Sequence, residues 1–299
     1  HPRKKGIYAV EIREGDKLIE AIARRRCVIV IGAGVSRNSV NSNGKRPATW
    51  EEFLNNCADE IQDDECIRSL LERKDFLTAC EVIKDKISHD GLIDKVQREY
   101  QREGYKTADI HRHVYNLDAS IVATPNFDNI YETHARVISS GTVIVKDHTS
   151  ADIANYLHGG DNRLILKTHG SADDPQNVIF TRKDYAEART KYVLFYEILK
   201  SLALTHTFLF LGCGTDDPDI RTIFEDIQFA HNRMPFHYMT LPEGEVSNDV
   251  LRIISNSMRI KFCNYSPNEG HLELTESLAE LVSKVEDYRS ENLSKTLKW

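Results

Sequence analysis

Four short blocks of residues with chemical potential follow one another along the chain. They are Gly32-Ala33-Gly34-Val35-Ser36, Thr124-Pro125-Asn126-Phe127-Asp128, Lys167-Thr168-His169-Gly170 and Leu211-Gly212-Cys213-Gly214. Each block follows an apolar run that predicts a buried strand, and an open parallel sheet binds its ligand at the carboxyl ends of its strands. Together the blocks supply glycines that let a backbone approach a phosphate, an amide, a carboxylate and an imidazole. This combination suits chemistry on a nucleotide.

The first glycine turn predicts a contact with phosphate. Glycines at 32 and 34 let the backbone bend so that N–H groups can reach a phosphate. The turn is neither a full dinucleotide fingerprint, because Arg37 occupies the third glycine position, nor a Walker loop, because Arg46 follows Gly44-Lys45. A tight turn without a ligand is the alternative interpretation.

Asn126 and Asp128 leave the predicted sheet just after Thr124. The amide of Asn126 both donates and accepts, so it could hold a water or a carboxamide in a fixed geometry. Asp128 could accept hydrogen bonds from ribose hydroxyls or cap the helix that begins near Asn129. Asn126 alone could also be an ordinary turn residue.

His169 is the histidine that stands at a strand end, in register with the other blocks. An imidazole titrates near neutrality and can take a proton from a sugar hydroxyl or a water. The chain has 12 histidines. We expect His111 and His113 to be structural, and His148 and His158 to be solvated.

The last glycine turn, Gly212 to Gly214, continues into Thr215-Asp216-Asp217-Pro218. These glycines could cradle the remaining part of a dinucleotide. The adjacent carboxylates are read as helix caps, with a metal site as the alternative.

Apolar runs that predict strands precede these blocks and recur after them. Buried strands are expected at 27–31, 121–124, 142–145, 164–167, 207–211, 237–240 and 259–262. Helical patterns separate them, including several helices between Trp50 and about Tyr105 and one from about Asp184 to Leu204. The sequence therefore predicts an α/β fold, a Rossmann-like parallel sheet with helices on both faces and a helical insertion after the first strand.

We expect residues 1–299 to form one domain, with 50–115 as a helical insertion or small helical subdomain within it. The last segment places five apolar residues on one helical face, which predicts packing against the sheet, with an oligomer contact as the alternative. These residues are Leu274, Leu278, Leu281, Val282 and Val285.

Composition excludes several classes of protein. The 299 residues are 40% hydrophobic and 28% charged, which is typical of a globular chain. A net charge of -7 does not favour direct nucleic-acid binding. No apolar stretch reaches the length of a membrane span, and the start lacks the apolar core of a signal peptide. The six cysteines include no Cys-x-x-Cys pair, so we expect no metal, buried thiols at Cys27 and Cys213, and a reducing cytoplasm.

Taken together, the four blocks resemble the sirtuin superfamily. Gly32 to Ser36 resembles its first cofactor loop, Thr124 to Asp128 its Thr-x-Asn-x-Asp signature, and His169-Gly170 its catalytic pair. Gly212 to Thr215 resembles its later nucleotide loop. The zinc module and the Pro-x-Phe-Arg element of the protein-deacylating members are missing. The pattern is similar to the zinc-less, sirtuin-like branch of bacterial anti-phage defence, whose members cleave NAD.

The resemblance implies hydrolysis of the nicotinamide–ribose bond of NAD, with Asn126 and His169 as catalytic residues. It implies cofactor-binding positions at Gly32, Ala33, Gly34, Ser36, Thr124, Asp128, Gly212, Gly214 and Thr215. It also implies a homo-oligomer and a partner such as a DNA-translocating ATPase or a short Argonaute. A non-catalytic NAD or ADP-ribose binding module and an ADP-ribosyltransferase are the alternatives.

Overall fold

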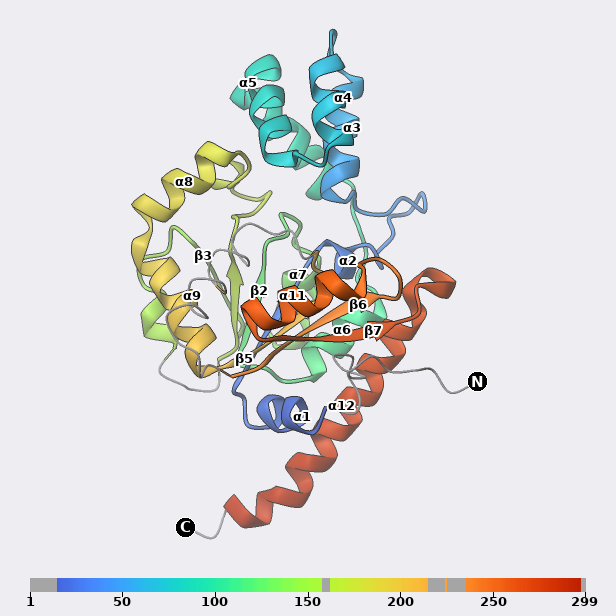
Figure 1. Cartoon of the computed structure of the whole chain (residues 1–299). Coiled ribbons are helices and arrows are strands. Elements are labelled where there is room, and N and C mark those ends of the chain that lie inside the picture. Colours follow the sequence, from blue (N-terminus) through green and yellow to red (C-terminus); the bar gives the residue numbers. More distant parts are fainter. Residues whose placement is uncertain (1–14, 158–161, 215–223, 225–234, 297–299) are drawn as a thin grey trace.

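Seven parallel strands form one sheet, in the order β3-β4-β2-β1-β5-β6-β7 (Figure 1). The computed structural model describes residues 15–157, 162–214, 224 and 235–296, with side chains to residue 292. The strands are β1 (Cys27–Ile31), β2 (Ile121–Thr124), β3 (Ile144–Asp147), β4 (Leu164–Lys167), β5 (Thr207–Leu211), β6 (His237–Pro242) and β7 (Ile260–Tyr265). The predicted parallel α/β fold is confirmed.

The strand order reverses beside β1. The chain runs from β1 to β2, β3 and β4 on one side and then crosses to β5 on the other. β1 pairs with both β2 and β5, so its carboxyl end lies at the switch point. In open α/β sheets a ligand binds in the crevice that forms there.

Alternate residues of each strand face opposite layers of helices. Val28 and Val30 belong to a core cluster with α9 (Val193–Thr205) and α11 (Asn248–Met258). Ile29 and Ile31 belong to a second cluster with α1 (Asp16–Ala23), α6 (Asp109–Asn116), α7 (Ile130–Ile138) and α12 (Asn268–Thr296). Burial on both faces explains the continuous apolar runs in the sequence.

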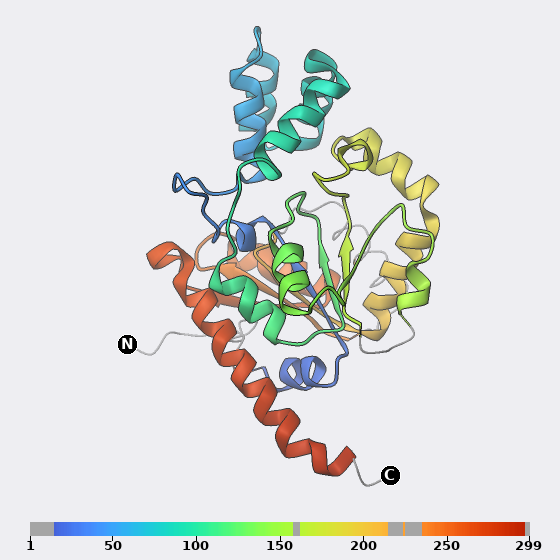
Figure 2. The same ribbon diagram turned by 180° about the vertical axis from the view of Figure 1, so that it is seen from behind.

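The last helix packs against the body of the protein, as expected. All five apolar residues of its predicted face are buried. The view from behind shows α12 crossing α1 and α6 (Figure 2). Packing on the sheet layer is therefore confirmed over an oligomer contact for this face.

The segment after β1 forms the predicted helical insertion. After the short α2 (Ala33–Ser36) come α3 (Trp50–Asp59), α4 (Glu65–Glu72) and α5 (Phe76–Tyr100), which kinks at Ser88. A capping box starts α3: Thr49 Oγ1 accepts from the Glu52 N–H, and the Glu52 carboxylate accepts from the Thr49 N–H. These three helices stand over the carboxyl edge of the sheet and enclose their own apolar core (Figure 1).

Two expectations about local structure were wrong. The predicted helix from 184 to 204 is two helices, α8 (Arg182–Lys191) and α9, because the chain leaves helical geometry at Tyr192. His148 is buried rather than solvated, because its ring packs against Tyr192 and Phe195. His158 lies outside the described residues. Short 3-10 turns occur at Ile153–Tyr156 and Pro175–Asn177.

Two buried histidines make folding stability depend on pH. Burial lowers the pKa of His111 to about 4 and that of His237 to about 3. Each ring uses Nδ1 to accept a backbone N–H, from Ala108 and Phe208 respectively. Because the unfolded chain binds these protons near pH 6.5, stability falls as pH drops below that value. We expect a loss of roughly 2 kcal/mol per histidine between pH 7 and pH 5.

Chemical denaturation at several pH values tests this prediction. His111→Asn keeps an acceptor for the Ala108 N–H but does not titrate, so its stability should depend less steeply on pH. His89→Gln alters an exposed histidine and should keep the wild-type slope. Equal slopes for all three proteins would show that His111 does not contribute.

Candidate functional site

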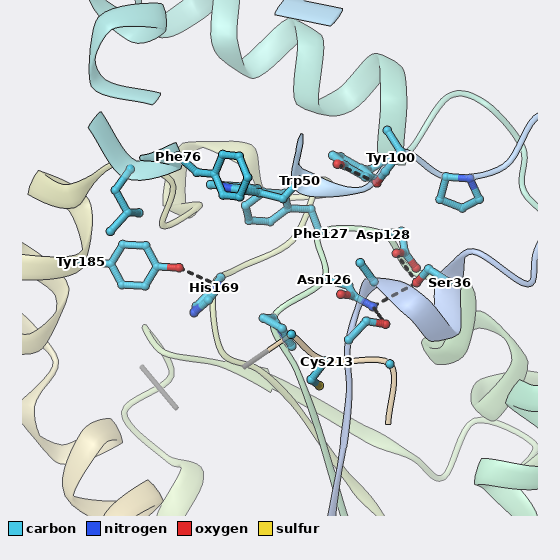
Figure 3. Close-up of a pocket in the computed structure, with 18 of the residues that line it drawn as sticks. Ser36, Trp50, Phe76, Tyr100, Asn126, Phe127, Asp128, His169, Tyr185 and Cys213 are labelled. Carbon is cyan, nitrogen blue, oxygen red and sulfur yellow. Dashed lines mark hydrogen bonds between the residues drawn. The ribbon is translucent and has the colours of Figure 1, made fainter. Parts of the chain in front are cut away.

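A cavity of about 460 Å³ lies where the carboxyl ends of the strands meet the helical insertion (Figure 3). This volume is within the range of small-molecule sites. The turns after β1, β2, β4 and β5 supply its floor, and residues of α3, α5 and α8 supply its walls. All four sequence blocks therefore contribute to one cavity.

The two glycine turns touch each other at the floor. The N–H of Gly32 donates to the Leu211 carbonyl at 2.8 Å, and the N–H of Gly34 donates to the Gly212 carbonyl at 2.9 Å. A Cβ on Gly34 would lie 2.8 Å from Gly212 Cα, so this contact requires glycine. These two N–H groups join the turns rather than face a phosphate. Glycine is needed here because the two backbones approach each other closely beside the cavity.

A hydrogen-bonded chain fixes the side chain of Asn126. Its Nδ2 donates to the Gly32 carbonyl at 2.9 Å and to Ser36 Oγ at 3.0 Å. Ser36 Oγ in turn donates to Asp128 Oδ2 at 2.7 Å. Because a carbonyl and a carboxylate can only accept, this chain sets the amide's orientation and turns Oδ1 toward the side on which His169 lies (Figure 3).

Asp128 serves two partners at once. Its Oδ1 accepts the N–H of Ile130, the first residue of α7, at 3.0 Å, while Oδ2 accepts the hydroxyl of Ser36. Asp128 is buried, yet it also lines the cavity. The N-cap residue of α7 is Asn129, and no side-chain cap is formed there, so Asp128 meets the helix-cap interpretation only through its bond to the first N–H of the helix. Its other carboxylate oxygen supports Asn126 through Ser36.

Two buried residues support this turn from below. Thr124 Oγ1 donates to the Ile31 carbonyl at 2.7 Å and accepts the N–H of Asn126 at 3.1 Å. Lys167 Nζ donates to the Asp128 carbonyl at 2.5 Å and forms a buried ion pair with Glu132. Burial raises the pKa of Glu132, although Lys167 opposes that shift. Thr124 does not line the cavity, so its contribution is to hold the Asn126 turn.

His169 forms part of the cavity wall opposite Asn126 (Figure 3). The side chain is buried, with 5% of its surface exposed, and its Nδ1 lies 3.4 Å from the hydroxyl oxygen of Tyr185. The backbone carbonyl of His169 accepts the N–H of Ile179, which anchors the turn after β4. The imidazole is therefore held at the strand end that the sequence indicated.

Sequence reasoning missed the aromatic wall of the cavity. Trp50, Phe76, Tyr100, Phe127 and Tyr185 all line it. The Trp50 ring packs 4.7 Å from Phe180, which closes the wall from behind. Burial raises the pKa of Tyr100 well above its usual value, so its phenol stays neutral and donates to the Ala48 carbonyl. The run Pro47-Ala48-Thr49-Trp50, close behind the first glycine turn, was the available signal.

The structure brings most of the proposed site residues together. Both catalytic candidates, Asn126 and His169, line the cavity, and so do six of the predicted cofactor-binding positions: Gly32, Ala33, Ser36, Asp128, Gly212 and Gly214. Gly34 and Thr124 lie behind the lining, where they hold the turns. Thr215, Asp216 and Asp217 lie outside the described residues.

Within the described part of the chain, no cluster of three or more His, Cys, Asp or Glu side chains could hold a metal ion. The six cysteines, all within the described residues, form no disulfide, and five of them are buried, Cys66 being exposed. Burial raises the pKa of Cys57 and Cys263 to about 12, which keeps these thiols protonated. Also within that part, no helix is long and apolar enough to cross a membrane.

We expect the purified protein to bind no structural zinc. Zinc ligands usually come in close sequence pairs, because a short turn must bring them to one ion, and this chain has no such cysteine pair. Elemental analysis before and after dialysis against a chelator measures this. One zinc per chain, with unfolding when it is removed, would contradict the expectation.

Comparison with known proteins identifies relatives of this chain. Residues 120–263 match the family model described as a SIR2-like domain. The chain is 30% identical over 223 residues to "NAD(+) hydrolase ThsA" of Enterococcus faecium, covering 73% of this chain and 44% of that protein. It is 25% identical over 211 residues to "Defense-associated sirtuin 2" of Bacillus subtilis, covering 66% of this chain and 20% of that protein. It is 22% identical over 239 residues to "NAD(+) hydrolase ThsA" of Acinetobacter baumannii, covering 78% and 46%. The matches span less than half the length of each relative.

Proposed function

Because the chain carries a SIR2-like domain and so belongs to the sirtuin-like family, we propose that it hydrolyses NAD as an effector of anti-phage defence. The main support for this proposal is the geometry of the site. The fixed amide of Asn126 and the imidazole of His169 face one cavity at the switch point of a parallel sheet. Two relatives are named NAD(+) hydrolases, which supports NAD cleavage as the reaction.

In the proposed reaction the bond between the ribose C1′ and the nicotinamide nitrogen breaks. Its electron pair goes to the pyridinium ring, which leaves as neutral nicotinamide. C1′ gains oxocarbenium character, and the oxygen of a water attacks it. His169 takes the proton of that water, either directly or through a ribose hydroxyl that passes its own proton to His169 and receives the water's. The products are nicotinamide and ADP-ribose, and attack by a hydroxyl of the same molecule would give a cyclic form.

The protein contributes chiefly by positioning and by placing charge. Asn126 Oδ1 accepts a hydrogen bond from the attacking water or from the nicotinamide carboxamide. The turn that contains Gly32, Ala33, Gly34 and Ser36 borders the pyrophosphate, and Gly212, Gly214 and Thr215 border the adenosine end. Asp128 supports the ribose end, and Thr124 contributes by holding the Asn126 turn. The aromatic wall limits access of bulk solvent to the cavity, so that the attacking water is the one that Asn126 and His169 hold.

Purified protein incubated with NAD, with nicotinamide and ADP-ribose quantified by chromatography, tests the proposal. Release of nicotinamide in step with ADP-ribose supports hydrolysis. Tight NAD binding without turnover, under conditions that activate the protein, would favour the binding module, and labelled NAD appearing on a macromolecule would favour ADP-ribosyl transfer.

We further propose that residues 1–299 act as a single sirtuin-like domain, with 50–115 as a helical insertion or small helical subdomain whose helices α3 and α5 line the cavity. We propose a cytoplasmic setting, in which cysteines stay reduced and form no disulfide. An enzyme that consumes NAD must be held back until needed. We therefore propose activation by assembly, as a homo-oligomer or with a partner such as a DNA-translocating ATPase or a short Argonaute. The assay above is accordingly run on the chain alone and with the product of the neighbouring gene.

A further inference from the structure

Tyr185 stands against the imidazole of His169, although no sequence block contains it. Its hydroxyl oxygen lies 3.4 Å from His169 Nδ1, and the two rings meet edge to face with centroids 5.1 Å apart (Figure 3). Both side chains are buried, each with 5% of its surface exposed. Burying a hydroxyl costs free energy unless it is hydrogen-bonded, so a phenol is favoured over a phenyl ring here only if its oxygen forms a hydrogen bond.

We propose that Tyr185 is a positioning residue for His169, whose Nδ1–H donates to the phenolic oxygen and whose Nε2 is thereby the basic nitrogen. The inference rests on the proposed function, in which His169 accepts a proton. A neutral imidazole carries its proton on one nitrogen, and only the other can act as a base. A hydrogen bond that Nδ1–H donates to the phenolic oxygen therefore leaves Nε2 as the nitrogen that reacts.

The helical insertion holds Tyr185 in place. A capping box starts α8, with Thr181 Oγ1 accepting the N–H of Asp184 and the Asp184 carboxylate accepting the N–H of Thr181. Asp184 also pairs with Lys84 of α5 at 3.1 Å, and the N–H of Lys183 donates to Glu81 of α5 at 2.7 Å. The first turn of α8 is thus fixed on α5, and Tyr185 follows directly.

These contacts give the insertion a role beyond closing the cavity. α5 follows β1 in the chain, whereas His169 follows β4, so α8 connects two otherwise separate parts of the site. A phenol held on a braced helix loses little freedom when it meets the imidazole. This is the arrangement that preorganises a general base.

Tyr185→Phe tests the inference, because phenylalanine keeps the ring and its edge-to-face packing but lacks the oxygen. We expect kcat for NAD to fall roughly five- to tenfold, the effect of one lost hydrogen bond, with KM unchanged. Tyr192→Phe is the matched control: Tyr192 packs on His148 outside the cavity lining, and its variant should keep the wild-type kcat.

A spectroscopic measurement separates this inference from the proposed function. Nitrogen-15 NMR of labelled histidine reports the tautomer of His169, with the signal assigned by its absence in His169→Gln. The inference is supported if His169 carries its proton on Nδ1 in the wild type and loses that preference in Tyr185→Phe. This holds even in a preparation that does not cleave NAD. A proton on Nε2 in the wild type, or an unchanged tautomer in the variant, would overturn it whatever the enzyme's activity.

Discussion

His169→Ala is expected to lower the rate of NAD cleavage by a factor on the order of 100 to 10,000, the usual cost of removing a general base. The imidazole lies in the cavity wall, and its neighbour Tyr185 is held by α8 rather than by His169. The backbone hydrogen bond from Ile179 to the carbonyl of residue 169 does not need the ring. The variant should therefore fold, and the loss should appear in kcat.

Nicotinamide release, measured beside thermal unfolding and NAD affinity, checks this prediction. His89→Ala is the control, because His89 is exposed on α5 and does not line the cavity. If a well-folded His169→Ala protein turns NAD over at the wild-type rate, another group is the base and the mechanism is wrong. If the variant is unfolded, His169→Gln, which keeps a polar side chain of similar size, decides the question.

Those parts of the fold that depend on local pattern could be predicted from the sequence. β1, β2, β4 and β5 lie at the predicted residues, because continuous, mostly apolar runs mark strands buried on both faces. β3 begins two residues later than predicted, at Ile144 rather than Thr142, because its residues are only half-buried and the apolar signal is weaker. The break between α8 and α9 at Tyr192 could not be predicted, because no glycine or proline lies there.

The candidate site, too, could be predicted only in the part that depends on local pattern. Asn126, His169 and the glycine turns could be placed, because each follows a strand and the carboxyl ends of parallel strands meet. Tyr185 and Trp50 could not, because they reach the cavity through helix packing that no spacing in the chain reveals. The burial of His148 was missed for the same reason: its ring packs against Tyr192 and Phe195, more than forty residues away in sequence.

Asn126→Ala is expected to leave most NAD binding in place while lowering turnover by roughly 100- to 1,000-fold, the loss typical of one preorganised polar group in an active site. Oδ1 of Asn126 would act on the water or carboxamide as the glycosidic bond breaks, so its contribution belongs mainly to the transition state. The fixed hydrogen bonds of Nδ2 to Gly32 and Ser36 are what make that oxygen preorganised.

Three further variants sharpen this prediction, with calorimetry for NAD binding and nicotinamide release for turnover. Ser36→Ala removes the link between Asn126 and Asp128 but keeps Oδ1, so its turnover should lie between those of the wild type and Asn126→Ala. Asp128→Asn should behave like Ser36→Ala, because the link ends on its carboxylate. Asn129→Ala, in the same turn but outside the cavity lining, should match the wild type. If binding and turnover fall equally in Asn126→Ala, the residue contributes uniform binding, and the oriented water must be held by another group.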